Sequence, residues 1–523
     1  MRLQQRFSMQ VFPSATHHRV SVSRLTVERA GALICALILG GCASFSGINP
    51  QSTMSDGHSI DGRALESSAA MKAARIDAVW PTATWWQAYR DPQLDHLISE
   101  AIANSPTLKV AQARIRQATA MTDIAKSATL PKVGAEASVT RELFTSDGLY
   151  PPPLGGTYNT SNGAYIRASY DLDLWDKDRN TLEAALDTVH VGSAEARAAQ
   201  LSLESTIVNA YLQLATQYVM RDLATAALEQ QQAIASIAHR RLKAGIGTNL
   251  EVSQAETNLP SARSTIEKVD ESIALLRNQL ATLTGQGPSA GDAIKRPSLA
   301  VKIAATGQNT SLPISLPSNI PAELIGRRPD VIAQRWRVEA LGKQIDVAKA
   351  AFYPNINLSA FIGFESIGLS QFINSVSAVR GAGPAISLPI FDGGRLRANL
   401  SSQTAQLDAA IEGYNGALLQ ALQSVADQCV KLKSLQLQRE QSEQALGLAQ
   451  KTFDLAQRGF KAGLTPYLDV IHAQITLLQE QQHVAQARAA YLAAWAQLMQ
   501  ALGGGLGDDL PTVASAAIAK PAP

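Results

Sequence analysis

Two stretches of the chain keep apolar residues at helical spacing for much longer than an ordinary globular helix. The first covers residues 180–243 without a proline, and the second covers residues 395–461. At 1.5 Å per residue, the first stretch would reach roughly 96 Å. Alanine-rich apolar seams at spacings of three and four run through the second stretch and beyond it, and such seams are typical of coiled coils. We therefore predict long helices that project far from any compact core.

Four shorter segments alternate apolar and polar residues, which predicts strands with one apolar and one polar face. They cover residues 132–140, 164–174, 355–364 and 382–391, and prolines interrupt the last one. A soluble sheet packed on helices would show the same alternation. Strands of about 9 to 11 residues, however, are long enough to cross a bilayer when tilted. Four strands cannot close a barrel, and an open edge in lipid leaves backbone groups unsatisfied, so a membrane barrel would have to be shared between subunits.

The chain carries an internal duplication. Pro106 and Pro329 each open a helical stretch, and they lie 223 residues apart. The sequences around Gly245 and Gly463 also match, at a separation of 218 residues. Each unit of roughly 220 residues reads helix, strand, loop, strand, long helix, tight turn and helix. If the alternating segments cross a membrane, the sequence predicts an α+β membrane protein with four transmembrane strands per protomer and long helical hairpins that form a coiled coil.

The duplication also suggests boundaries along the chain. We predict a lipoprotein signal peptide at 1–41, a first repeat at 42–284 and a linker rich in Gly, Pro, Ser, Ala and Thr at 285–328. The linker would form a belt around the middle of the helices. The second repeat follows at 329–502, and a C-terminal tail covers 503–523.

The N-terminus resembles a bacterial lipoprotein signal. Arginines precede an apolar run at 30–39, which is too short to span a membrane and ends at Gly41-Cys42. Small residues before the cleavage point suit a peptidase, and the Cys42 thiolate can accept a diacylglyceryl group. Because Ala43 follows instead of Asp, the resemblance implies sorting to the outer membrane. An ordinary signal peptide that happens to contain a cysteine is the alternative, and translation could also start at Met9.

Composition and motifs exclude several classes of protein. The 523 residues hold 46 Lys and Arg against 44 Asp and Glu, a balance that gives no sign of a nucleic-acid-binding surface. The sequence lacks HExxH, CxxC, GxSxG and GxxxxGK[ST] patterns, so we predict neither an enzyme nor a bound metal or cofactor. With only three cysteines, one of them Cys42, the mature chain is not expected to depend on a disulfide.

Taken together, these features resemble the TolC family of outer-membrane factors, and within it the OprM-like, NodT-type lipoproteins. The resemblance rests on Cys42, the tandem units, the strand exits Trp175-Asp176 and 391–394 (FDGG), and the Lys-Ala-Gly turns. It implies a homotrimer with a 12-stranded barrel in the outer membrane and a helical tunnel through the periplasm. The tunnel would dock on a periplasmic adaptor supplied by an inner-membrane pump. The chain would then be a passive exit duct for drugs or other small toxic compounds.

The two tight turns are the first candidate site. Glycine suits a helix reversal because the turn passes through positive φ, so a simple helix cap is the structural alternative. In the resembling family these turns form the periplasmic tip that meets the adaptor. The candidate adaptor contacts are Ala244, Gly245, Ile246, Gly247, Thr248, Ala462, Gly463, Leu464 and Thr465.

The second candidate site is a periplasmic gate. Glu251 and Asp469 each lie six positions beyond a turn glycine, and three copies would form rings of carboxylates that favour cations. His472 stands where the resemblance leads us to expect a second acidic residue, which would alter the charge of the gate. The alternative is that these are ordinary solvated charges on a helix.

Two other functions compete with efflux. An outer-membrane duct for type I-like protein secretion would share the architecture and differ only in its pump. A periplasmic coiled-coil adaptor belongs to a different class, but an adaptor normally has one hairpin between small β-domains. Two hairpins and four alternating segments therefore favour the channel.

Overall fold

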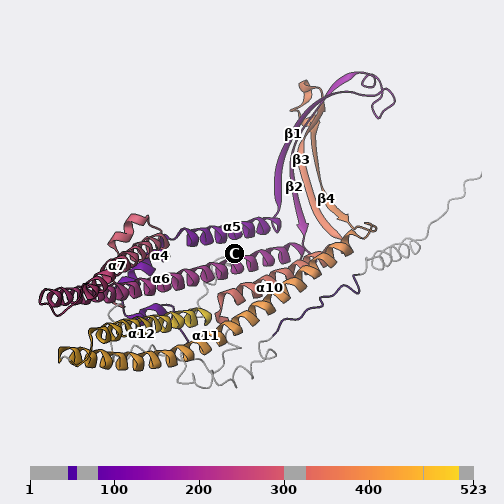
Figure 1. The fold of residues 1–523 in the computed structure, drawn as a ribbon. Helices are drawn as coiled ribbons and strands as arrows, with labels where there is room; N and C mark the ends of the chain where they lie inside the picture. Colours follow the sequence, from indigo (N-terminus) through magenta and orange to yellow (C-terminus); the bar gives the residue numbers. More distant parts are fainter. Residues whose placement is uncertain (1–44, 56–79, 300–325, 463, 506–523) are drawn as a thin grey trace, which may run out of the picture.

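The computed structural model describes residues 45–55, 80–299, 326–462 and 464–505. Gly41, Cys42 and Gly463 lie outside the described residues, as does the tail from residue 506. The molecule is elongated, with a four-stranded sheet at one end of a long helical body (Figure 1). No helix among the described residues is both long and apolar enough to cross a membrane.

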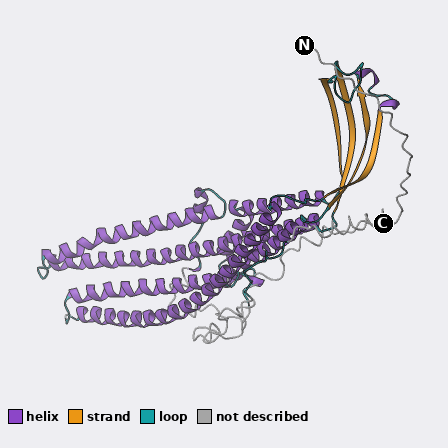
Figure 2. Cartoon of the chain, turned by 90° about the vertical axis from the view of Figure 1, so that its right-hand side faces the viewer, coloured by secondary structure: helices purple, strands orange, loops and turns teal. Residues whose placement is uncertain are grey.

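Two helical hairpins make up most of the body. The first joins α6 (Lys177–Lys243) to α7 (Asn249–Leu283), and the second joins α11 (Arg395–Lys461) to α12 (Tyr467–Ala501). The predicted long helices at 180–243 and 395–461 are confirmed to within three residues. Both hairpins point away from the sheet and turn at the same end of the molecule (Figures 1 and 2).

Three shorter helices complete the body. They are α4 (Pro92–Asn104), α5 (Pro106–Ala128) and α10 (Pro329–Ala350). All three begin with a proline at the first helical position. A backbone N–H at that position has no acceptor within the helix, so its absence in proline costs no hydrogen bond. Because α5 precedes the first strand pair and α10 precedes the second, the element order repeats along the chain.

The sheet is antiparallel, in the order β1-β2-β3-β4. Its strands are β1 (Lys132–Leu143), β2 (Tyr158–Leu172), β3 (Asn355–Ile367) and β4 (Ala378–Ser387). The pairing of β2 with β3 joins the two repeats in one sheet. β1 and β4 are the edges, so each has one side without a partner strand among the described residues.

Two strands differ from the prediction: β2 was expected at 164–174 but covers Tyr158–Leu172, and β4 is also displaced. We expected it at 382–391, but β4 begins at Ala378 and ends at Ser387. Pro389 therefore lies beyond the strand, while Pro384 lies inside it. An edge strand tolerates a proline because one side of its backbone has no ladder bond to lose. Sequence periodicity alone did not show that this strand was an edge.

The register separates the two faces of the sheet. Ala135, Ile166 and Ile362 are aligned across three neighbouring strands, and Ile166 and Ile362 are 55% and 60% exposed. Alternate positions carry Glu136, Arg167 and other polar residues. This face is therefore largely apolar and uncovered among the described residues, as the alternation predicted, although the exposed Arg380 of β4 continues the row of Ile362.

The hydrophobic core lies where the helices meet in the middle of the body. Trp85 and Tyr89 of η1 (Trp85–Tyr89) pack their rings against Trp495 of α12. The buried Tyr89 hydroxyl donates to the carbonyl of Leu492 at 2.7 Å. These contacts fix the start of the first repeat against the last helix of the second.

The linker between the repeats is held against this core. Its short helix η2 (Pro288–Ala293) packs on α7. The buried carboxylate of Asp91 caps α4 and also accepts hydrogen bonds from the Ser298 hydroxyl at 2.8 Å and the Leu299 amide at 3.2 Å. Where it is described, the linker therefore lies beside the helices.

Residues 45–55 form a strap along α11. The Asp408 carboxylate accepts from the backbone amides of Gln51 and Ser52 at 2.8 and 2.9 Å. The Asn415 side chain accepts from the Ser55 amide and donates to the Thr53 carbonyl. At its other end, Phe45 packs edge-on against Phe352, next to the start of β3. The strap thus fixes the chain three residues beyond Cys42 close to the sheet.

Candidate functional site

The first tip is a tight helix-ending turn. The amides of Gly245 and Ile246 donate at 3.0 Å to the carbonyls of Leu242 and Arg241, the bond pattern of a Schellman cap. Gly245 has φ +73° and open space around it, so conformation alone requires glycine there. A Cβ at Gly247 would instead lie 2.9 Å from the Leu242 amide nitrogen. Gly245 is therefore required by its backbone conformation, whereas Gly247 is required because there is no room for a side chain.

The described residues of the second tip repeat part of this geometry. The Leu464 amide donates to the Gly459 carbonyl at 2.8 Å, the counterpart of the bond from Ile246 to Arg241. The Ala462 amide closes the last turn of α11 on the Arg458 carbonyl at 3.0 Å. Thr465 turns back and donates its hydroxyl to the Ala456 carbonyl. Both predicted turns are thus found at the free end of the molecule.

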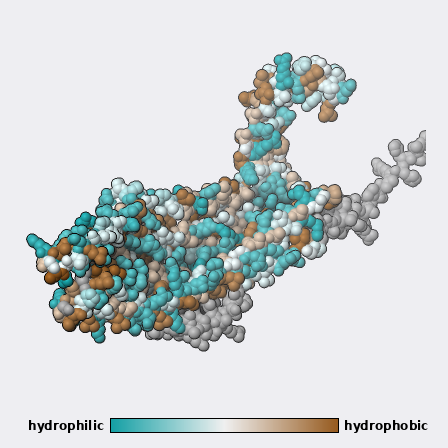
Figure 3. All heavy atoms as spheres, viewed as in Figure 1, coloured by the Kyte–Doolittle hydropathy of each residue, from teal (hydrophilic) through white to brown (hydrophobic). Residues whose placement is uncertain are grey.

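Each tip presents a pair of exposed apolar side chains. Ile246 and Leu250 are both 66% exposed, and their counterparts Leu464 and Leu468 are 81% and 54% exposed. Figure 3 shows hydrophobic residues gathered at the free end of the hairpins. The candidate list included Ile246 and Leu464 but missed Leu250 and Leu468. They could have been found from the sequence, because they are leucines at equivalent positions in the two repeats.

The candidate gate residues follow the tips. Glu251 closes a capping box at the start of α7: its amide donates to the Thr248 hydroxyl at 3.2 Å, and its carboxylate accepts from the Thr248 amide at 3.4 Å. Asp469 lies in the first turn of α12, and His472 follows one turn later; both are exposed. Each chain supplies one Glu251 and one Asp469, on different hairpins. A ring of either carboxylate would therefore need several copies of the chain.

Aromatic and aliphatic side chains border the sheet where it meets the helices. The Trp175 ring stacks on Tyr353 at 4.5 Å, and its indole N–H donates to the Pro354 carbonyl at 2.9 Å. Ile390 and Phe391 nearby are 86% and 92% exposed. Large exposed apolar residues also lie at the opposite end of the sheet, among them Leu149, Tyr158, Ile373 and Val376. Such girdles at both ends of an apolar sheet face are typical of strands that cross a membrane.

The sheet exits explain the motifs noted in the sequence. Asp176 and Gly394 precede α6 and α11 with φ 54° and φ 88°, so each chain segment turns sharply from strand to helix. Asp392 supports the second turn by accepting from the amides of Gly394 and Leu396 at 3.0 Å.

Comparison with known proteins agrees with this architecture. The model of the family described as outer membrane efflux protein matches residues 97–286 and 320–504. The chain belongs to this family. It is therefore an outer-membrane efflux channel, and the predicted TolC-type fold and family are confirmed.

Several family members are similar over most of their length. The fusaric acid resistance protein FusA of Burkholderia cepacia is 46% identical over 71% of this chain and 68% of that protein. The multidrug resistance outer membrane protein MdtP of Escherichia coli (strain K12) is 32% identical over 82% and 87%. The structure of the outer membrane protein VceC from Vibrio cholerae has a TM-score of 0.73 at 34% identity, covering 82% of this chain and all of that one.

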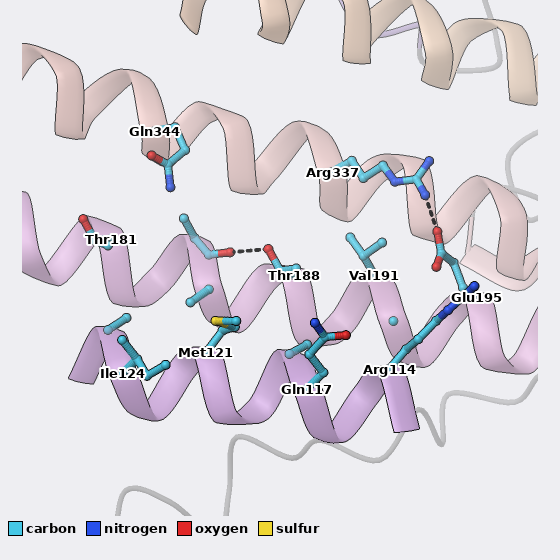
Figure 4. Close-up of a pocket in the computed structure, with 15 residues that line it drawn as sticks. Arg114, Gln117, Met121, Ile124, Thr181, Thr188, Val191, Glu195, Arg337 and Gln344 are labelled. Carbon is cyan, nitrogen blue, oxygen red and sulfur yellow. Dashed lines mark hydrogen bonds and ion pairs between the residues drawn. The ribbon is translucent and has the colours of Figure 1, made fainter. Parts of the chain in front are cut away.

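This efflux channel also has a groove between α5, α6 and α10, with a volume of about 660 Å³ (Figure 4). Small side chains such as Ala118, Ala184 and Gly192 leave the space, and an ion pair between Arg337 and Glu195 lies at its edge. The groove contains no nucleophile paired with a base. Within the described ranges, no group of three His, Cys, Asp or Glu side chains is placed to hold a metal ion.

Carboxylates gather on α6 near the sheet. Lys343 of α10 donates to Glu183 at 2.5 Å, which holds the pKa of the Glu183 carboxyl below its ordinary value. Burial and the neighbouring Glu339 raise the pKa of Asp187 to about 6. The Asp187 carboxyl at this junction of the efflux channel therefore has a pKa closer to neutral pH than an ordinary aspartate.

Proposed function

We propose that three copies of this chain form a passive exit duct through the outer membrane and the periplasm. Twelve strands would close a barrel, and the helical hairpins would form the periplasmic tunnel. The single observation that carries this proposal is the position of the sheet. It lies at one end of the molecule with an uncovered apolar face and two open edges, while both hairpins point the other way.

The edges argue for a shared barrel. β1 and β4 each have backbone groups on one side with no partner strand in the part of the chain that the structure describes. In lipid each unsatisfied group costs several kcal/mol. Pairing β4 of one copy with β1 of the next removes that penalty, and copies of four strands close a barrel only as two or more subunits. The family resemblance favours three.

The tips are the proposed contact with a periplasmic adaptor. Adaptors of tripartite systems present helical hairpins, and small residues such as Ala244 and Ala462 allow close backbone approach. The exposed pairs Ile246–Leu250 and Leu464–Leu468 add apolar area that has no other role in the single chain. An inner-membrane pump would supply the energy, and the channel itself would catalyse no reaction and need no cofactor or metal.

Rings of Glu251 and Asp469 near the tip would select among the solutes that pass, as rings of carboxylates do in cation channels. His472, one turn beyond Asp469, would modify the second ring. Lipidation at Cys42, after cleavage at Gly41, would add an anchor in the outer membrane.

Drugs and other small toxic compounds are the proposed cargo. Relatives are named for resistance to fusaric acid and to multiple drugs, and this supports efflux over protein secretion. The two hairpins and the four-stranded sheet also disfavour a periplasmic adaptor, which has one hairpin.

The proposal is tested by deleting the gene and measuring accumulation of fusaric acid and of a fluorescent drug such as ethidium. We expect accumulation to rise and to return to normal when the full chain is restored. Light scattering of the purified protein should give the mass of three chains. Unchanged accumulation of every compound tried would overturn the efflux proposal, and a monomeric mass would overturn the shared barrel.

A further inference from the structure

The polar face of the sheet carries one compact group of large side chains. Arg167 and Tyr165 of β2, Phe361 and Glu365 of β3 and Glu136 of β1 occupy three adjacent rows of the register. Many other positions on this face hold small residues such as Ser138, Ser169 and Ser359. We call this group the aromatic station.

Direct contacts join its members. The Arg167 guanidinium lies 4.6 Å from the centre of the Tyr165 ring and 5.8 Å from that of Phe361, and it is 3.4 Å from the Glu136 carboxylate. The Tyr165 hydroxyl donates to Glu365 at 3.0 Å. The two rings meet nearly edge to face, with centres 6.5 Å apart. Each side chain is thereby fixed by at least one neighbour.

Glycines on the same and on neighbouring strands make room for the rings. A Cβ at Gly381 would lie 2.7 Å from the Phe361 ring. A Cβ at Gly163 or Gly363 would lie 2.8 or 2.9 Å from the Tyr165 ring. Glycine weakens the interior of a strand, and it often marks a place where something must approach the backbone closely. Three such glycines around two rings indicate a built arrangement.

The station is open and has an excess of negative charge. The side chains of Arg167 and Glu136 are 53% and 64% exposed, and Phe361 is 38% exposed. Two carboxylates stand against one guanidinium. The rest of the polar face adds one basic residue and two acidic ones, Lys132, Glu142 and Asp171. Negative charge beside ring faces attracts organic cations.

We propose that the aromatic station is a binding site for aromatic cations in the exit path. The inference rests on the proposed function, because only a closed barrel would turn this face toward permeating solutes. Each trimer would then carry three stations at one height. The two rings cross at 76°, so the solute's ring would stack on one of them, in the place that the Arg167 guanidinium occupies in this structure. Its positive charge would lie beside Glu136 and Glu365. An aliphatic cation of equal charge would lack the stacking contact.

The test measures binding of ethidium, a planar aromatic cation, to the full-length protein in nanodiscs of zwitterionic phosphatidylcholine. Fluorescence anisotropy gives the Kd, and empty nanodiscs give the background. We expect E136Q/E365Q to raise the Kd about tenfold and Phe361→Leu to raise it about threefold. The matched control is Glu142→Gln, which removes a charge from the same face six residues from Glu136 and should change the Kd less than twofold.

Competition on the unmodified chain keeps the test valid if F361L fails to assemble. A non-fluorescent aromatic cation should displace ethidium, whereas tetrapropylammonium at the same concentration should not. Equal displacement by both cations, or an equal effect of E142Q and E136Q/E365Q, would overturn the station in favour of a diffuse acidic surface. Failure of the efflux proposal would appear separately, as normal drug accumulation in the deletion strain.

Discussion

Thr248 and Glu251 satisfy each other's backbone groups at the start of α7, so Glu251 has a structural role whether or not it gates the channel. Glu251→Gln separates the capping role from the gating role, because glutamine can complete a capping box but carries no charge. We expect unchanged thermal stability and a lower cation preference in planar-bilayer recordings. Glu251→Ala, which also loses the cap, should reduce stability by about 1 kcal/mol. Unaltered ion selectivity in E251Q would leave Glu251 as a cap alone.

Asp187 gives the helical body a pH-dependent stability. The folded chain holds its proton up to about pH 6, whereas the unfolded chain releases it near 3.8. The folded state therefore binds this proton more tightly than the unfolded state does. As the pH rises from about 4 to about 6, the contribution of Asp187 to the free energy of unfolding falls, and it does not return at higher pH. Asp187→Asn should stabilise the protein at pH 7.5 by about 1 kcal/mol, after allowing for solvent around a half-buried carboxyl.

Circular dichroism melting at pH 5 and pH 7.5 measures this effect. Asp346→Asn is the control, because Asp346 is an exposed carboxyl on α10 paired with Lys349. A D187N protein with the same pH dependence as the unmodified chain would contradict the assignment.

Among the elements, the two tips are the most accessible to experiment. Ile246→Asp together with Leu464→Asp places a charge on each exposed apolar pair. We expect cross-linking to the adaptor to fall at least tenfold while the trimer survives, because neither side chain is buried in the chain. Ile246→Leu with Leu464→Met keeps the apolar surface and should cross-link normally. Loss of the trimer in the aspartate variant would mean that these side chains hold subunits together instead.

The sequence predicted the individual helices and strands better than the contacts between them. The long helices carry uninterrupted periodicity, so both were located to within three residues. The capping box could also have been found, since Thr248 and Glu251 have its spacing. The aromatic station could not, because Tyr165 and Phe361 are almost 200 residues apart and only the register of β2 with β3 brings them together. The bounds of β4 were wrong for a similar reason: they are set by its pairing with β3, which runs from Phe364–Ala378 to Asn355–Ser387 and is not visible in the sequence.

For the whole molecule, the strap at residues 45–55 bears on what the lipid would do. Asp408 and Asn415 hold the strap, and Phe45 holds it beside the sheet. Removing the acyl chains through Cys42→Ser leaves these contacts intact. We expect several-fold less protein in the outer membrane but near-normal drug export per assembled channel. Quantitative immunoblotting of membrane fractions, read beside accumulation assays, measures both. Full loss of export per channel would show that the anchor is needed for conduction.

The two hairpins have matching arms: α6 and α11 each contain 67 residues, and α7 and α12 each contain 35. Their turns lie at the same end of the molecule (Figures 1 and 2). An insertion of seven residues in each arm of one hairpin would raise its tip by about 10 Å and leave the other behind. Changes in the length of this protein are therefore expected to occur in both repeats together. Because of the duplication, two distant parts of the gene must encode hairpins of matching length.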